Sequence, residues 1–281
     1  MTPAGPADHP DPGHRGDVDA FASADLWIVD LDGVIWLTGE AIGDVTTAVA
    51  DLRSHGVRIA FATNNSAPTT AELLARLERL AIPATDEDLV TSAEALASLL
   101  APGQSVKVLA EGGVTEALTA RDVHTVDDGP VDAAVVGWSH TFDFDLLAAT
   151  ATAARTSGRL LASNEDPTHP TPAGLMPGAG SILAAVATAS GITPEIAGKP
   201  HQPMAALMMA KYGFAEGDRS VVMVGDQPRT DGGLAHRLGI PYALVDSGVT
   251  PPGADHFDVP VSVRYPDFVS LVRASLARRT G

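Results

Sequence analysis

The sequence predicts an α/β fold, with a Rossmann-like parallel-sheet core and an α/β domain inserted into that core. Short apolar runs, each the length of a buried strand, alternate along the chain with segments whose apolar residues recur at helical spacing. A long segment in the middle of the chain repeats this alternation by itself. Strands that alternate with helices pair in parallel and are joined by right-handed crossovers, so both parts are expected to contain parallel sheets.

The elements follow from these runs in chain order. Strands are predicted at residues 26–29, 57–62, 106–109, 133–136, 160–162, 221–224 and 242–245. Helices are predicted around residues 45–52, 73–80, 182–189, 204–212 and 268–276, with the core resuming at Ile196. Residues 1–24 are rich in Pro, Gly, Asp and His, and we expect them to form a disordered leader.

The first strand ends in two aspartates, in the run Asp30-Leu31-Asp32-Gly33. Alternate side chains of an extended segment share a face, and chemistry in open α/β sheets lies beyond the carboxyl ends of strands. Two carboxylates there can hold a divalent cation, and one of them can act as a nucleophile. Taken alone, the pattern is more often an Asp-rich turn that closes a strand.

Polar residues also follow the strand at 57–62, in the run Thr63-Asn64-Asn65-Ser66. Hydroxyl, amide and free backbone N–H groups ahead of a helix form an anion site. The alternative is an ordinary Asn-rich loop that caps the helix, and the two roles are compatible.

Lys199 stands between a glycine and a proline, and it is one of only three lysines in the chain. A compact ammonium group can neutralise an aspartate and a phosphoryl group together. A solvated loop lysine is the alternative.

A third and a fourth carboxylate follow the strand at 221–224, at Asp226 and Asp231. They are expected at the same edge of the sheet as Asp30. Asp231 alone is also typical of a helix terminus.

Together, D-x-D-G-V, T-N-N-S, G-K-P and G-D-x-x-x-T-D resemble the haloacid dehalogenase superfamily of aspartate-nucleophile phosphotransferases over about residues 25–249. Residues 133–138, 160–168 and 177–181 are similar to its nitrophenyl-phosphatase branch, which acts on phosphoglycolate, glycerol phosphate, pyridoxal phosphate and nucleoside monophosphates. Two positions depart from that pattern, Glu165 where a proline is common and Pro68 where an arginine is common. The resemblance implies a core at 25–90 and 194–281 and a cap domain at 91–193.

The resemblance further implies a Mg²⁺-dependent phosphatase that hydrolyses small phosphate monoesters through an aspartyl-phosphate intermediate. Asp30 is then the nucleophile, and Asp32 protonates the leaving group and later activates water. The Mg²⁺ ligands are Asp30, the backbone carbonyl of Asp32, and Asp226. Asp231 is expected to orient a metal-bound water or Lys199.

Substrate contacts are expected from both domains. Thr63, Asn64 and Lys199 are expected to hold the phosphoryl oxygens. In the cap, Asn164 and Asp166 either contact the leaving group or lie in a solvated turn, with His169 and Trp138 as the next candidates for specificity. Rival functions on the same core are a phosphomutase or phosphotransferase, and a phosphorylatable receiver-like module, against which the large cap argues.

Composition limits the partners. The 281 residues carry a formal net charge of −17, which argues against a nucleic-acid-binding surface. The absence of cysteine excludes disulfides and thiolate metal sites. No apolar run approaches membrane-spanning length and no signal peptide is visible, so a cytoplasmic protein acting on a small phosphorylated metabolite is expected. A homodimer is an expectation from the resemblance alone.

Overall fold

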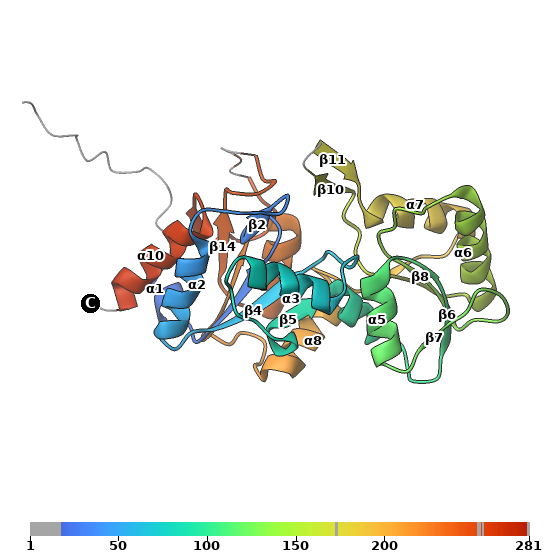
Figure 1. Ribbon diagram of the computed structural model, residues 1–281, viewed down its shortest axis with the longest axis horizontal. Coiled ribbons are helices and arrows are strands. Elements are labelled where there is room, and N and C mark those ends of the chain that lie inside the picture. The colour runs from blue at the N-terminus through green and yellow to red at the C-terminus, as the bar shows by residue number, and fades with distance from the viewer. Residues whose placement is uncertain (1–17, 172–173, 252–253, 255, 280–281) are drawn as a thin grey trace, which may run out of the picture.

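The computed structural model describes residues 18–171, 174–251, 254 and 256–279. It has two lobes side by side along the long axis of the molecule, each built on its own parallel sheet (Figure 1). The predicted α/β class is confirmed.

The larger sheet has six parallel strands in the order β15-β14-β13-β1-β4-β5. Its strands are β1 (Leu26–Asp30), β4 (Arg58–Thr63), β5 (Leu89–Thr91), β13 (Val221–Gly225), β14 (Tyr242–Val245) and β15 (Val263–Tyr265). Because β1 lies between β4 and β13, the carboxyl ends of these three strands adjoin.

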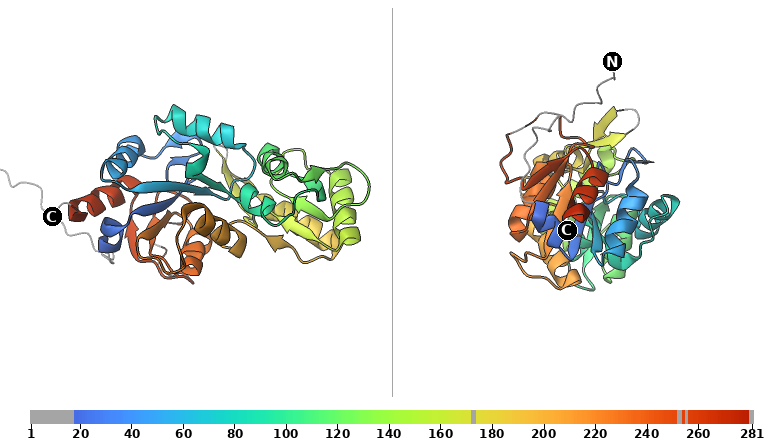
Figure 2. Two further views of the ribbon diagram at one scale, coloured as in Figure 1. Left: turned by 90° about the horizontal axis from the view of Figure 1, so that it is seen from below. Right: turned by 90° about the vertical axis from the view of Figure 1, so that its left-hand side faces the viewer.

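Helices cover both faces of this sheet (Figure 2). One face packs against α1 (Val18–Ser23), α2 (Val45–Ser54), α3 (Thr70–Arg79) and α10 (Phe268–Arg279), and the other against α8 (Gln202–Tyr212) and α9 (Gly233–Leu238). Trp27 and Val29 point into the first layer, while Leu26 and Ile28 point into the second. Burial on both faces explains why β1 is an unbroken apolar run.

The smaller sheet has five parallel strands in the order β12-β9-β8-β6-β7. They are β6 (Ser105–Leu109), β7 (His124–Thr125), β8 (Ala133–Val136), β9 (Leu160–Ala162) and β12 (Glu195–Ile196). Helices α6 (Phe144–Ser157) and α7 (Ala179–Ser190) cover one face and α5 (Gly112–Ala120) the other. Through α4 (Ser92–Ala97), one buried apolar cluster runs from the larger sheet into the smaller one.

Two hairpins and two short helical segments complete the described elements. The hairpin of β2 (Trp36–Leu37) and β3 (Glu40–Ala41) follows β1, and that of β10 (Thr168–Thr171) and β11 (Gly174–Pro177) rises from the junction of the lobes (Figure 1). The helical segments are the 3₁₀ turn η1 (Asp86–Asp88) and the π-helical turn η2 (Pro228–Gly232).

The prediction of a disordered leader over residues 1–24 is wrong for its last part. Residues 18–23 form α1, and Phe21 is fully buried, with its ring packed edge-to-face 5.6 Å from Trp27. One aromatic side chain among alanines is enough to dock this short helix on the core, although the average composition of the segment is polar. Residues 1–17 lie outside the described residues.

The five-stranded sheet also extends past the boundary predicted at residue 193. β12 pairs in parallel with β9, so Ile196 belongs to this sheet and not to the resumed core. No helix in the described part of the chain is long and apolar enough to cross a membrane.

Candidate active site

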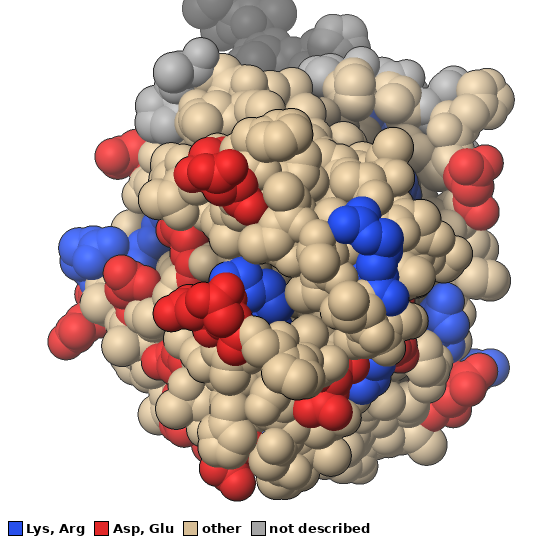
Figure 3. Space-filling view, turned by 90° about the vertical axis from the view of Figure 1, so that its right-hand side faces the viewer, with Lys and Arg blue, Asp and Glu red and all other residues tan. Residues whose placement is uncertain are grey.

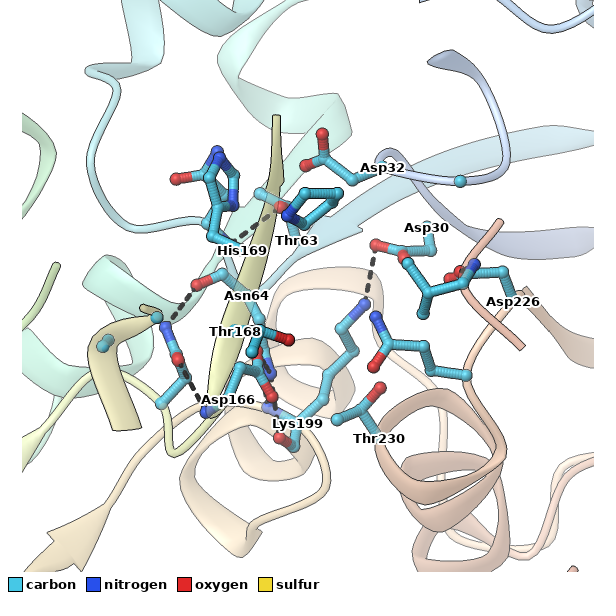
Figure 4. Close-up of a pocket in the computed structure, with 18 of the residues that line it drawn as sticks. Asp30, Asp32, Thr63, Asn64, Asp166, Thr168, His169, Lys199, Asp226 and Thr230 are labelled. Atoms are coloured by element: carbon cyan, nitrogen blue, oxygen red, sulfur yellow. Dashed lines mark hydrogen bonds and ion pairs between the residues drawn. The ribbon is translucent and has the colours of Figure 1, made fainter. Parts of the chain in front are cut away.

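A cavity of about 70 Å³ lies at the carboxyl ends of β1, β4 and β13, where the second lobe meets the first (Figure 4). Eight of the nine predicted site residues line it, namely Asp30, Asp32, Thr63, Asn64, Asn164, Asp166, Lys199 and Asp226. The ninth, Asp231, contacts the ammonium group of Lys199. The structure thus brings together residues up to about two hundred positions apart in the chain.

Lys199 is the centre of the buried charge network. Its Nζ donates to Asp30 Oδ1 and to Asp231 Oδ1, each at 2.7 Å, and to the Ala62 carbonyl at 3.2 Å. Burial alone would lower the pKa of Lys199, but the Asp231 and Asp30 carboxylates raise it above its ordinary value. The side chain is 2% exposed, so Lys199 is a permanently charged buried group and not a solvated loop lysine.

Asp30 and Asp226 are two buried carboxylates in an acidic surrounding. Burial raises the pKa of Asp30 well above its ordinary value; Lys199 opposes this, and Asp231 and Asp226 add to it. Burial, aided by the charge of Asp231, raises the pKa of Asp226 to about 7. A single ammonium group therefore does not balance the carboxylates gathered here.

The same carboxylates fit a divalent cation. Ligand oxygens of Asp30, Asp226 and Asp231 all lie within 4.8 Å of one another, the one such cluster of three found in the described residues. Asp226 Oδ2 accepts a hydrogen bond from the Val249 amide at 2.7 Å, whereas Asp226 Oδ1 is buried with no hydrogen-bond partner. A buried orphan oxygen among carboxylates is what a hard, oxygen-seeking ion such as Mg²⁺ satisfies.

Two glycines make this crowding of carboxylates sterically feasible. Gly33 has φ +86°, and a Cβ there would lie 2.6 Å from the carboxyl group of Asp226. A Cβ on Gly225 would lie 2.2 Å from the carboxyl group of Asp231. Both motif glycines are therefore needed for the close approach of the acids.

Replacement of Asp226 tests the proposed cation site through stability. A folded-state pKa of about 7, above the ordinary value of 3.8, makes the metal-free protein gain stability as pH falls from 8 towards 4. Metal-free Asp226→Asn should be more stable than metal-free wild type at pH 8, and its melting temperature should depend less on pH. Mg²⁺ should raise the melting temperature of the wild type at pH 8 and not that of the variant.

Thermal unfolding in chelator and in Mg²⁺, at pH 6 and pH 8, measures these effects. Asp145→Asn, at an exposed position of α6, is the control and should follow the wild type. An Asp226→Asn protein that responds to pH and Mg²⁺ as the wild type does would contradict the assignment.

Asp32 has a different environment from Asp30. It is partly exposed, and its Oδ1 accepts a hydrogen bond from the indole Nε1–H of Trp36 at 2.9 Å. The turn at Gly33, whose amide donates to the Trp36 carbonyl at 2.7 Å, brings the tryptophan back to the aspartate. The sequence analysis does not identify Trp36 as a site residue. The one local signal for it is Gly33, because a tight glycine turn can fold residue i+4, here Trp36, back onto residue i, here Asp32.

Thr63 and Asn64 are placed by their own hydrogen bonds. Thr63 Oγ1 accepts from the Asn65 amide at 3.0 Å, so its hydroxyl hydrogen remains able to donate. Asn64 Nδ2 donates to Asp166 Oδ2 and to the Lys199 carbonyl, each at 3.0 Å, and its Oδ1 accepts from the Lys199 amide at 2.8 Å. The side chain of Asn64 thus holds the backbone of Lys199 and, through Asp166, the loop 163–166 of the second lobe.

The loop 163–166 of the second lobe lies against the residues that follow β4. Asn164, only 5% exposed, donates to the Asn64 carbonyl at 2.7 Å, which excludes a solvated turn at that residue. Ser66 and Ser163 share a buried hydrogen bond of 2.8 Å. Glu165 Oε1, at the position that departs from the family pattern, lies 3.0 Å from Arg229 and 3.2 Å from His201. Burial raises the pKa of Asp166, with the Asn64 hydrogen bond opposing it.

The β10–β11 hairpin covers the cavity from the side of the second lobe. Thr168 and His169 on β10 line the cavity and lie over it (Figure 4). Trp138 Nε1 donates to the Pro177 carbonyl at 3.0 Å, and its ring lies 5.6 Å from that of His169. Trp138 therefore anchors the hairpin that carries His169.

Charged side chains of both signs occur outside the cavity, on the end of the molecule that Figure 3 shows. At the far end of the lobe with the five-stranded sheet, acidic and basic side chains are interspersed on a largely uncharged surface (Figure 3). No broad basic area is seen on the described part of this face, in keeping with the net charge of −17.

The chain was compared with known families. The sequence model described as haloacid dehalogenase-like hydrolase matches residues 27–124, and the one described as HAD-hydrolase-like matches residues 196–269. The resemblance inferred from the motifs is confirmed by both matches.

Curated relatives were also found. A D-glycerol 3-phosphate phosphatase of Mycobacterium tuberculosis is 36% identical over 232 residues, which make up 80% of this chain and 64% of that protein. This chain thus spans somewhat less than two thirds of that relative. An acid sugar phosphatase of Staphylococcus saprophyticus is 31% identical over 228 residues, 80% of this chain and 87% of that protein. The relatives are phosphatases, as the sequence predicted.

Solved structures agree with the sequence relatives. The glycerol phosphate phosphatase from Mycobacterium tuberculosis in complex with magnesium has a TM-score of 0.80 at 33% identity, covering 89% of this chain and 76% of that one. The p-nitrophenyl phosphatase from Archaeoglobus fulgidus has a TM-score of 0.83 at 26% identity, and the match covers 90% of this chain and 99% of that one. The magnesium in the first of these agrees with the predicted cofactor.

Proposed function

The chain belongs to the haloacid dehalogenase-like hydrolases, and we propose that it is a Mg²⁺-dependent phosphatase of small phosphate monoesters with Asp30 as the nucleophile. The observation that carries this proposal is the position of Asp30. Its carboxylate lies at the carboxyl end of the central strand, in contact with a buried ammonium group, beside two further acids and in the same cavity as Asp32.

Asp30, the backbone carbonyl of Asp32, and Asp226 would hold the cation. When bound, Mg²⁺ neutralises charge on the phosphoryl oxygens and on the surrounding carboxylates. Lys199 adds a second positive charge, fixed at 2.7 Å from the nucleophile by Asp231 on its other side. Asp231 therefore acts on Lys199, which is one of the two roles expected for it.

The reaction follows in two displacements. In the first, an Asp30 oxygen bonds to phosphorus while the bond to the leaving oxygen breaks, and Asp32 gives its proton to that oxygen. In the second, Asp32 takes a proton from water, which attacks the aspartyl-phosphate and releases inorganic phosphate. Thr63 and Lys199 stabilise the phosphoryl oxygens in both steps, and Asn64 acts by holding Lys199 and Asp166.

The size of the cavity supports a small leaving group. The cavity of about 70 Å³ lies between the core strands and the β10–β11 hairpin and is partly open to solvent. D-Glycerol 3-phosphate, the substrate named for one curated relative, is of this class, and another relative is named an acid sugar phosphatase. Contact of Asn164 and Asp166 with the leaving group stays a prediction; His169, which faces the cavity, is a second candidate for that contact.

Other expectations from the sequence stay proposals. They are the beginning of a cap domain at residue 91, the cytoplasmic location and the homodimer. A phosphomutase or phosphotransferase remains the rival on this core, and product analysis with acceptor sugars separates it from a phosphatase. A receiver-like module would instead accumulate a phosphoaspartate that lasts for minutes without turnover.

Screening of a panel of phosphometabolites with Mg²⁺ tests the proposal. We expect release of inorganic phosphate from glycerol phosphates or small sugar phosphates, and loss of all activity in EDTA that excess Mg²⁺ restores. Hydrolysis that continues unchanged in metal-free enzyme would contradict the cation site, and phosphoryl transfer to a sugar in place of water would favour the rival.

A further inference from the structure

Trp36 is a buried hydrogen-bond partner of the Asp32 side chain. The indole is fully buried in the layer between the larger sheet and α3, and its Nε1–H donates to Asp32 Oδ1 at 2.9 Å. Asp32 and Trp36 also pair as an isolated β-bridge, and the Gly33 amide closes the same turn on the Trp36 carbonyl. Both ends of this hydrogen bond are therefore fixed to one rigid turn.

Arg76 lies over the face of the indole ring, whose edge donates to Asp32. Its guanidinium carbon lies 4.3 Å from the centroid of the Trp36 ring, within the range of a cation–π contact. Arg76 also feels the charge of Asp32: burial lowers the pKa of the guanidinium, and the Asp32 carboxylate opposes this. The tryptophan is thereby held between α3 and the turn that carries Asp32.

We propose that Trp36, held by Arg76, is a positioning residue for Asp32 in proton transfer; this rests on the acid–base role of Asp32 in the proposed function. The indole occupies Oδ1, so the proton is given and taken at Oδ2. In the first displacement the Oδ2–H bond breaks as the proton passes to the leaving oxygen, whose bond to phosphorus is breaking. In the second, Oδ2 takes the proton back from the attacking water.

The identity of the leaving group makes this role measurable. An alkoxide leaves poorly without a proton, whereas nitrophenolate is stable enough to leave without one. A misplaced Asp32 should therefore slow the first displacement for alkyl phosphates far more than for nitrophenyl phosphate. A purely structural role of Trp36 would slow both substrates alike.

Trp36→Phe is the main test, because phenylalanine keeps an aromatic ring for Arg76 and removes the N–H donor. For glycerol 3-phosphate, kcat/KM should fall about 10- to 100-fold, part of the about 10²- to 10⁴-fold that a positioned acid contributes. For nitrophenyl phosphate it should fall less than about 3-fold, since little of that acid contribution is needed there.

Trp27→Phe is the matched control. Trp27 is equally buried, but its Nε1 has no hydrogen-bond partner, so the change removes a similar volume without removing such a bond. It should change kcat/KM for both substrates by the same small factor. Arg76→Met, at a half-buried position, removes both the ring contact and a positive charge that acts on Asp32, so it should also slow the alkyl phosphate selectively, and it serves if Trp36→Phe does not fold.

Asp32→Asn separates the positioning role of Trp36 from the acid–base role of Asp32. If Asp32→Asn is selective for the alkyl phosphate while folded Trp36→Phe and Arg76→Met are not, the positioning role of Trp36 is overturned and that of Asp32 stands. If Asp32→Asn itself slows both substrates equally, the acid–base role of Asp32 fails and the inference fails with it. Selectivity in all three variants, absent from Trp27→Phe, is the expected result.

Discussion

Asp30→Asn is expected to lower kcat for phosphate monoesters by at least about 10⁴-fold while the protein stays folded. The amide nitrogen cannot attack phosphorus, and no other carboxylate in the cavity is paired with Lys199 and open to the substrate. Folding should survive, because the amide oxygen can still accept the hydrogen bond that Lys199 Nζ gives to Asp30 Oδ1 at 2.7 Å.

Nitrophenyl-phosphate hydrolysis with Mg²⁺ measures the loss, and circular dichroism checks the fold. Asp145→Asn, exposed on α6, provides the matched control and should keep wild-type activity. A folded Asp30→Asn protein with substantial turnover would remove Asp30 from its assigned role.

Lys199→Met is expected to reduce both activity and stability. Loss of the ammonium removes one fixed positive charge from the phosphoryl site, an effect of about 10²- to 10³-fold in kcat by analogy with a lost oxyanion donor. It also leaves Asp30 and Asp231 buried without their cation, which costs about 3–5 kcal/mol. In a protein of this size that lowers the melting temperature by about 10 °C.

The stability loss of Lys199→Met should depend on pH. The pKa of Asp30 is already raised by burial, and removal of Lys199, which opposes that rise, raises it further. The folded variant therefore gains stability as pH falls, and its deficit should be smaller at pH 5.5 than at pH 8. Thermal unfolding of metal-free protein at both pH values measures this.

Lys107→Met is the control for the loss of a lysine. Lys107 Nζ donates to the backbone carbonyl of Asp127 and contacts no carboxylate among the described residues. Its replacement should change the melting temperature by no more than about 2 °C, as for most surface substitutions. A Lys199→Met protein that unfolds at the wild-type temperature at pH 8 would show that the buried network contributes little to stability.

The core of the site was predictable because its signals are local. Three apolar runs of strand length are followed by polar residues that line the cavity, at Asp30, Thr63 and Asp226. The carboxyl ends of parallel strands meet at one edge, so the order of the runs was enough to place these groups together.

The contacts between the lobes could not be predicted in the same way. The Asn64–Asp166 and Ser66–Ser163 hydrogen bonds join residues that are 102 and 97 positions apart. No periodicity or spacing indicates such pairs, because they depend on how the second lobe is placed on the first. For this reason the sequence left Asp166 either in contact with the leaving group or in a solvated turn, and its hydrogen bond with Asn64 was not foreseen.

The helix α1 was missed for a different reason. Residues 1–24 are polar on average, and this average conceals the short apolar run Ala20-Phe21-Ala22. Trp36 lies outside the D-x-D-G-V motif, and its hydrogen bond to Asp32 depends on the turn conformation at Gly33, which the residue type of Trp36 does not indicate.

The identity of the phosphorylated side chain tests the central claim most directly. Enzyme quenched in acid during turnover with Mg²⁺ and substrate can be treated with borohydride, which reduces an aspartyl-phosphate to homoserine, and peptide mass spectrometry then locates the change. We predict homoserine at position 30, present with substrate and absent without it. Homoserine at Asp32, Asp226 or another carboxylate, or none at all during steady hydrolysis, would contradict the assignment of Asp30 as the nucleophile.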